Sequence, residues 1–197
     1  KDQSLQVMRE LSKRDTRIRL FHHENHGAGY TRNRGIQLAS GQYITFIDAD
    51  DFVDNNYLET FMNEIGNNDV LISGYKKVTM KSHDVLFTSI PLDCEWTEFK
   101  YVSTCAKLYA LNFLKENHIQ YAPLKIGEDV YFNLTINSKT ENIKIISYAG
   151  YNYCLNENSV TQNRKTLVVD NKILSLLNQI YNDLSLEKKY SNKMIQY

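Results

Sequence analysis

The sequence has little cysteine, proline or glycine. Its 197 residues include 3 Cys, 2 Pro and 8 Gly. So little glycine and proline excludes collagen-like and low-complexity classes. The cysteines are odd in number and lack a CxxC spacing, so they indicate neither a disulfide framework nor a zinc cage. This cysteine use is typical of a reducing compartment, and we therefore expect a cytoplasmic location.

An excess of charge of either sign is also lacking. Lys and Arg number 23, and Asp and Glu also number 23. A chain without net charge has no global field to attract nucleic acid, which we do not expect as a partner. No apolar run approaches the ~20 residues that a membrane-spanning helix needs. With 42% hydrophobic residues, the chain can bury the core of one globular domain.

Hydrophobic patterns in the first half alternate between helix and strand. Residues 4–14 and 55–65 have helical spacing, whereas 42–48 form a nearly continuous apolar run and 70–75 a second strand. A continuous apolar strand is typical of a buried parallel sheet. The sequence therefore predicts an α/β fold with a mostly parallel sheet flanked by helices.

The second half is predicted less evenly. Residues 79–96 read as short polar strands or loops, which would suit an inserted flap, and 103–117 and 127–136 suit helices. Residues 143–153 are rich in strand formers. Apolar residues at helical spacing over 168–184 predict an amphipathic helix.

An acidic cluster, DADD, follows directly after the apolar run 42–48. It contains Asp48, Asp50 and Asp51. Ligand crevices of open α/β sheets lie at the carboxyl ends of the strands, so these acids are expected at a site. Oxygen ligands select Mg²⁺ or Mn²⁺. A calcium-binding EF-hand loop is the alternative, but Val53 stands where its glycine is required.

Two further segments contain candidate site residues. In GEDVYF, Glu128 and Asp129 could supply a general base, or could merely favour the first turn of a helix. The segment ENHGAGYTRNRGI contains Gly27 and Gly29, but Arg32 stands where a dinucleotide-binding fingerprint needs its third glycine. We therefore do not expect a nicotinamide or flavin cofactor.

Five motifs, taken in order, resemble those of family 2 inverting glycosyltransferases with the GT-A fold. They are ENHGAGYTRNRGI, GQYITFIDADD, CAKLY, GED followed by YF, and YNYCLNENSVT. The match looks closest to bacterial members that build surface polysaccharide or decorate glycans. The resemblance implies a Rossmann-like GT-A domain over residues 1–161 and a C-terminal helical extension over 162–197.

The resemblance also implies residue roles. Asp50 corresponds to the direct ligand of Mn²⁺ or Mg²⁺ on the donor diphosphate, Asp48 to the acid turned toward the ribose or the metal, and Asp51 to a further metal-site acid. Asp129 corresponds to the general base, beside Glu128. The residues expected near the nucleotide, phosphate or acceptor are Arg32, Asn33, Lys107 and Ser159, the last in a loop that closes over the site in relatives.

The implied reaction transfers a sugar from a nucleoside-diphosphate donor, expected to be a UDP-sugar, to a hydroxyl of a glycan or lipid-linked acceptor. Trp96, Tyr101 and Tyr121 are aromatic candidates for stacking on sugar. The C-terminal helix leaves open packing on the domain, homodimer formation and peripheral attachment at the inner face of the cell membrane, although it lacks a strongly basic face.

The family's first strand and its Asp-Asp-Gly-Ser motif are not found, and KDQSL resembles the residues that follow that motif. We therefore expect an N-terminally truncated GT-A domain, a fragment of a longer enzyme. Two other functions stay open at this point. One is nucleotidyl transfer, which also uses paired Asp residues with Mg²⁺. The other is a glycan-binding or assembly module that keeps the fold without turnover.

Overall fold

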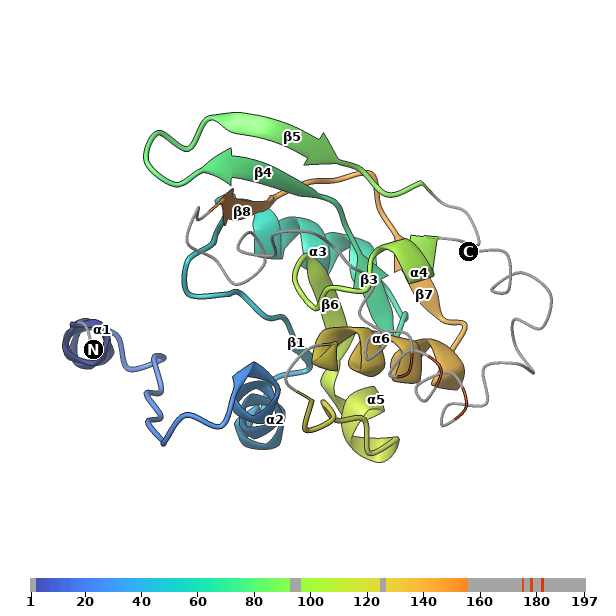
Figure 1. The fold of residues 1–197 in the computed structure, drawn as a ribbon, viewed down its shortest axis with the longest axis horizontal. Coiled ribbons are helices and arrows are strands. Elements are labelled where there is room, and N and C mark those ends of the chain that lie inside the picture. The colour runs from blue at the N-terminus through green and yellow to red at the C-terminus, as the bar shows by residue number, and fades with distance from the viewer. Residues whose placement is uncertain are drawn as a thin grey trace.

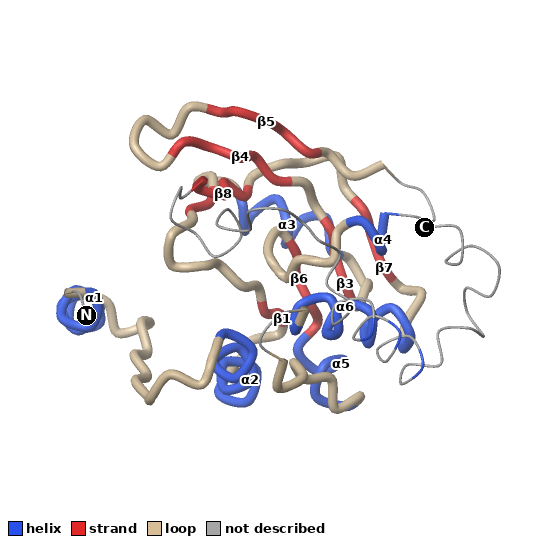
Figure 2. The backbone as a smooth tube through the Cα atoms, in the orientation of Figure 1, coloured by secondary structure: helices blue, strands red, loops and turns tan. Residues whose placement is uncertain are grey.

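The computed structural model describes residues 3–92, 97–124 and 127–155, together with Ser175, Asn178 and Asn182. These last three positions have helical backbone and are exposed. The remainder of the predicted C-terminal helix and the predicted loop residue Ser159 lie outside the described residues. Figures 1 and 2 show one sheet at the centre, with helices on both faces, and a second sheet above it.

The central sheet has the strand order β1-β6-β3-β7. Its strands are β1 (Tyr43–Ile44), β3 (Val70–Ile72), β6 (Lys107–Ala110) and β7 (Ile143–Ile145). β6 is antiparallel to both β1 and β3, whereas β3 and β7 are parallel. The prediction of an α/β fold is confirmed. The expectation of mostly parallel pairing is corrected. Strands β1, β3 and β7 run in one direction, but β6 lies between β1 and β3 in the opposite direction, so that both of its pairings are antiparallel.

The second sheet has the order β2-β8-β4-β5. It consists of β2 (Phe52–Val53), β4 (Tyr75–Thr79), β5 (Val85–Ser89) and β8 (Tyr151–Leu155). β4 and β8 are parallel, and β4 and β5 form an antiparallel hairpin that projects at the top of Figure 1. This hairpin accounts for much of the stretch predicted as a flap, and β8 brings a segment late in the chain next to it.

Helices cover both faces of the central sheet. On β3, Val70 and Ile72 belong to the core cluster that includes residues of α2 (Ala28–Leu38), α5 (Leu111–Glu116) and α6 (Glu128–Lys139). Leu71, which points the other way, belongs to the cluster formed with α3 (Tyr57–Ile65). This alternation is the period of two expected for a strand buried on both faces.

Two helices contribute less to this packing. α1 (Ser4–Arg14) buries none of its residues and stands apart from the rest of the ribbon in Figure 1. α4 (Thr97–Lys100) is a single turn ahead of β6. Of the described residues, no helix combines the length and the hydrophobicity that a membrane crossing requires.

The segment 103–117 differs from its predicted structure. It was expected to be one helix, but it forms strand β6 followed by the short helix α5. β6 fills the space between β1 and β3 and forms ladders with both. Such tertiary pairing overrides a weak helical preference. The run predicted as one strand over 143–153 is likewise divided into β7 and β8.

Candidate active site

Arg32 joins the two acidic motifs. Its side chain, on α2, is 15% exposed, with one guanidinium nitrogen 2.9 Å from Asp48 Oδ1 and the other 3.5 Å from Glu128 Oε1. The guanidinium also lies over the ring of Tyr121, 5.6 Å from its centroid. The DADD and GED segments, far apart in sequence, therefore meet at a single cation.

Asp51 is held by the second sheet. Tyr151 donates its hydroxyl hydrogen to Asp51 Oδ2 at 2.6 Å, and the backbone N–H of Cys154 donates to Oδ1 at 2.9 Å. The Tyr151 hydroxyl oxygen also accepts from the backbone N–H of Asp48 at 3.1 Å. Burial raises the pKa of Asp51, and the neighbouring charges of Asp50 and Asp48 act in the same direction. Both Asp51 oxygens are thus used to attach β8 to the acidic turn.

Cys105 lies beside the same acids. Its Sγ is 3.6 Å from Asp48 Oδ2, and ligand atoms of Asp48, Asp51 and Cys105 lie within 4.8 Å of one another. Burial, with a smaller effect of the Asp48 charge, raises the pKa of Cys105 to about 11. Without a bound cation the group is therefore a neutral thiol near pH 7, and coordination of a metal would require the loss of its proton.

The chemistry of this donor set fits a hard cation held by carboxylates. Asp50 is exposed at the turn, close enough to add its charge to the field at Asp51. Of the three acids of the DADD turn, only Asp48 forms an ion pair with Arg32 among the described contacts. A divalent ion bound to Asp50 and shared with Asp48 would offset the remaining negative charge, and oxygen donors suit Mg²⁺ or Mn²⁺.

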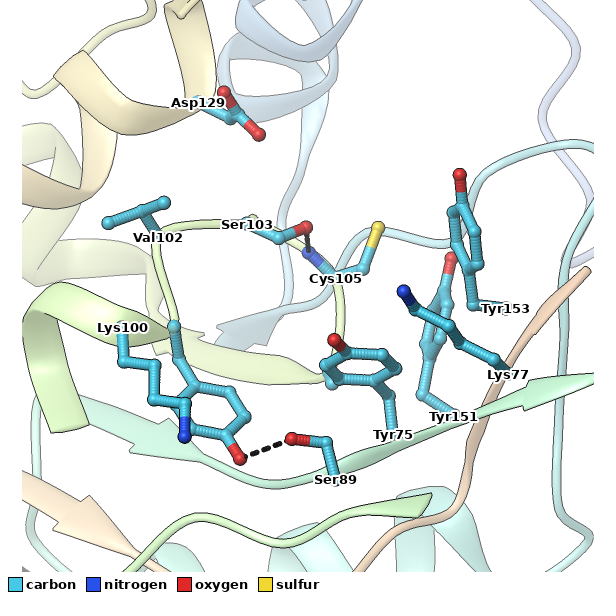
Figure 3. Close-up of a pocket in the computed structure, with 12 residues that line it drawn as sticks. Tyr75, Lys77, Ser89, Lys100, Val102, Ser103, Cys105, Asp129, Tyr151 and Tyr153 are labelled. Carbon is cyan, nitrogen blue, oxygen red and sulfur yellow. Dashed lines mark hydrogen bonds between the residues drawn. The ribbon is translucent and has the colours of Figure 1, made fainter. Parts of the chain in front are cut away.

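Asp129 lines a cavity of about 370 Å³. It is the second residue of α6, and the helix follows Gly127, whose φ of 84° is in the left-handed region that favours glycine. Figure 3 shows the Asp129 carboxylate on one side of this cavity and Tyr75 on the other. Because Glu128 contacts Arg32, the two acids of the GED motif have different surroundings, and it is Asp129 that faces open space.

Asn33, predicted to contact the nucleotide, has its amide bonded to the protein. Its Nδ2 donates to the carbonyl of Tyr121 at 2.9 Å, and its Oδ1 accepts from the N–H of Tyr121 at 2.8 Å. This pair of bonds fixes Tyr121 beneath Arg32. The structure therefore gives Asn33 a positioning role.

Lys107 corrects another expectation. It was predicted near acceptor or phosphate, but its residue is only 2% exposed, because it belongs to the central strand β6. Its Nζ donates to Asn133 Oδ1 at 2.6 Å and to the carbonyl of Tyr101. Asn133 in turn donates to the carbonyl of Asp129 at 2.8 Å. Lys107 is thus behind the wall of the site, and burial lowers its pKa to about 7.

Of the aromatic residues proposed to stack on sugar, one lines the cavity and one is packed inside the protein. Tyr101 lines the cavity, whereas Tyr121 stacks on Phe132 with ring centroids 4.0 Å apart. Trp96 lies outside the described residues. Three other tyrosines that line the cavity were not expected there, although the alternation in YNYC was a usable signal for the two on β8. They are Tyr75, Tyr151 and Tyr153.

The fold and this pair of acidic segments define a GT-A glycosyltransferase domain. The chain belongs to glycosyl transferase family 2, because the sequence model of that family matches residues 1–114. The expected family, fold class and enzyme class are therefore confirmed.

Individual relatives agree with this assignment. The chain is 27% identical to the uncharacterized glycosyltransferase EpsJ of Bacillus subtilis over 82% of its own length and 52% of that protein. It is 25% identical to the glycosyltransferase GlyA of Streptococcus pneumoniae, covering 82% of this chain and 26% of GlyA. The chain thus spans about half the length of these relatives, or less.

The fold is also similar to solved structures of S. aureus TarS. In the complex of TarS with UDP-GlcNAc, the similar region has a TM-score of 0.68 and 23% identity, and it covers 84% of this chain and 50% of that one. At this level of identity the likeness supports the fold, including its mixture of strands and covering helices.

Proposed function

We propose that this domain is the catalytic domain of a metal-dependent inverting glycosyltransferase. It would transfer a sugar from a nucleoside-diphosphate donor to a hydroxyl of a glycan or lipid-linked acceptor. The similar TarS structures contain UDP and UDP-GlcNAc, which favours a UDP-sugar as donor. A cytoplasmic location, membrane attachment and homodimer formation stay predictions.

The observation that carries the proposal is the separation of the acids around Arg32. Glu128 and Asp48 share the guanidinium, while Asp129 faces the cavity. In this arrangement Asp129 accepts the proton of the acceptor hydroxyl as its oxygen forms a bond to the anomeric carbon. The bond from that carbon to the diphosphate oxygen breaks on the opposite face, so the configuration is inverted.

We assign the acidic turn to binding the leaving nucleoside diphosphate through a metal ion. We assign Asp50 as the direct ligand of Mg²⁺ or Mn²⁺ with Asp48 beside it, and we assign Asp51 to holding β8, since both its oxygens accept hydrogen bonds. When bound, such an ion neutralises charge that grows on the leaving diphosphate. Arg32, already paired with Asp48 at 2.9 Å, is the cation that we assign to contact with the diphosphate.

Donor turnover tests the proposal. Release of nucleoside diphosphate is measured from a panel of UDP- and dTDP-sugars with Mn²⁺ or with EDTA, on the full-length protein. We expect Asp50→Ala to abolish the metal-dependent signal. Asp129→Asn should lower kcat by about 10²–10⁴-fold, the usual contribution of a general base, without weakening donor binding.

Glu116→Gln provides the matched control, because Glu116 is an exposed acid at the end of α5. It should leave turnover unchanged. Wild-type turnover in Asp129→Asn would refute the assignment of the base. Nucleotidyl transfer and a non-catalytic module do not require an acid that faces a cavity, so the position of Asp129 favours glycosyl transfer over both.

A further inference from the structure

The floor of the cavity beside Asp129 is one face of the second sheet. In the register of β4 and β8, Tyr75 lies opposite Tyr151 and Lys77 opposite Tyr153. Residues two apart on a strand share a face, so these four side chains form two adjacent rows. Ser89 of β5 extends the first row, since it pairs with Tyr75. All five residues line the cavity.

The other face of β4 is used differently. Lys76, which points away from the cavity, forms an ion pair with Asp54 at 2.7 Å. Asn152 on β8, opposite Lys76, donates to the same carboxylate at 2.8 Å. Lys76 is therefore bound within this sheet by its ion pair with Asp54. Its neighbour Lys77 forms no such ion pair among the described residues.

Two ammonium groups line the cavity, those of Lys77 and Lys100. Figure 3 shows Lys77 reaching over the floor toward Cys105, and Lys100 on the side of the cavity where Val102 and Ser89 lie. Within residues 3–92, 97–124 and 127–155, no carboxylate forms an ion pair with either lysine. Asp129 is the acid among the lining residues, so the described wall carries a surplus of one positive charge.

We propose that the acceptor of this enzyme is an anionic glycan or polyol, whose phosphate or carboxylate groups are bound by Lys77 and by Lys100 at separate points of the cavity wall. The tyrosine rows supply the apolar and hydroxyl surface against which its carbon skeleton packs. This inference rests on the proposed function, because it takes the cavity beside Asp129 as the acceptor site. Ammonium groups suit either anion, since lysine acts as a point charge with rotatable donors.

Binding of matched probes tests the inference without any donor. The charged probes are ribitol 5-phosphate and the methyl glycoside of galacturonic acid as its carboxylate, and their neutral partners are ribitol and methyl galactoside. We expect each recognised anion to bind about tenfold more tightly than its neutral partner at low salt, with the difference reduced as salt is added. Preference for the phosphate or for the carboxylate probe identifies the source of the anion.

Three variants connect the preference to the cavity. Lys77→Gln and Lys100→Gln should each weaken anion binding by about fivefold, as expected for loss of one charge-assisted contact at a partly exposed site. Neither should change the binding of the neutral probes. Lys77→Arg should retain the preference. Lys139→Gln, at an exposed lysine at the far end of α6, is the matched control and should change nothing.

Equal binding of charged and neutral probes would overturn the inference, and so would an equal loss in the Lys139 variant. Thermal unfolding of each variant ensures that the comparison is made between folded proteins. The outcome is independent of the donor assay. Sugar transfer to neutral acceptors with no charge preference would retain the proposed function and refute the anionic acceptor. Anion binding that depends on Lys77 and Lys100 without turnover of any donor would retain an anion site in the cavity and refute its assignment as the acceptor site of a transferase.

Discussion

The buried lysine of the central sheet makes the stability of this protein depend on pH in a defined direction. Lys107 has its ordinary pKa of 10.5 lowered to about 7, first by burial, against which the charges of Asp129, Cys105 and Glu98 act. Between these two values the unfolded chain holds a proton on Lys107 that the folded chain has released. The free energy of unfolding therefore rises with pH in this window. The cost of the buried charge is fully present below about pH 7 and is gone above about pH 10.5.

The magnitude follows from the width of the window. The shift from 10.5 to about 7 corresponds to a cost on the order of 5 kcal/mol, or about 1.4 kcal/mol for each pH unit within the window. Lys107→Met removes the titrating group. It also leaves the carbonyl of Tyr101 without its Nζ donor, which changes stability by a constant amount. The slope against pH, and not the offset, is therefore the quantity predicted.

Urea unfolding of the wild type and of Lys107→Met, between about pH 7.5 and about pH 9, measures that slope. Other titrating groups cancel in the difference between the two proteins. We expect the wild type to gain about 1.4 kcal/mol per pH unit relative to the variant. Lys139→Met, at an exposed position on α6, should give a flat difference. Parallel curves for Lys107→Met would refute the reasoning, because they would mean that Lys107 keeps its ordinary pKa when folded.

Two further predictions concern packing around the site, and urea unfolding checks both. Asn33→Ala should lower the free energy of unfolding by about 2 kcal/mol, because both its hydrogen bonds to the backbone of Tyr121 are lost; an unchanged value would mean that water replaces the amide. Gly74→Ala should destabilise the protein by about 2 kcal/mol or more, since its Cβ would collide with the carbonyl of Ser89. Gly35→Ala, where a Cβ meets no atom within 4 Å, should instead stabilise α2 by about 0.5–1 kcal/mol, and equal effects of the two glycine changes would contradict this account.

The acidic turn could be predicted from the sequence because its signal is local. An apolar run over 42–48 that ends in Asp48 and Asp50 predicts acids after a strand, whatever the rest of the chain does. The structure keeps this order, although strand β1 is limited to Tyr43–Ile44 and is half-buried and not buried throughout as expected. The acids of the GED motif were likewise expected at the start of a helix, where α6 begins at Glu128. The meeting of these segments at Arg32 was not predicted as such, since the sequence indicated a contact with nucleotide and not the ion pairs with Asp48 and Glu128.

Features that depend on pairing between distant strands could not be predicted. The pattern around Lys107 was compatible with a helix, and only the unfilled position between β1 and β3 makes it a strand. Both faces of a central strand are covered by helices. Lys107, which was predicted to contact a ligand, is therefore buried in the structure. The cavity floor has the same origin, because the register of β4 with β8 is set by tertiary structure and not by either segment alone.

The arrangement around Arg32 gives a physical reason for unequal roles among five clustered acids. One guanidinium contacts Asp48 and Glu128, and hydrogen bonds from Tyr151 and Cys154 use both oxygens of Asp51. These three acids already have protein partners in the folded domain, and Asp48 has only its second oxygen left to share an ion. The remaining two are Asp50, which is exposed at the turn, and Asp129, which faces the cavity. An exposed carboxylate keeps its charge and can bind a cation, and one beside a cavity can take a proton from a bound hydroxyl. The two acids that have the most open surroundings are thus those to which we assign the metal ion and the acceptor proton in the proposed reaction.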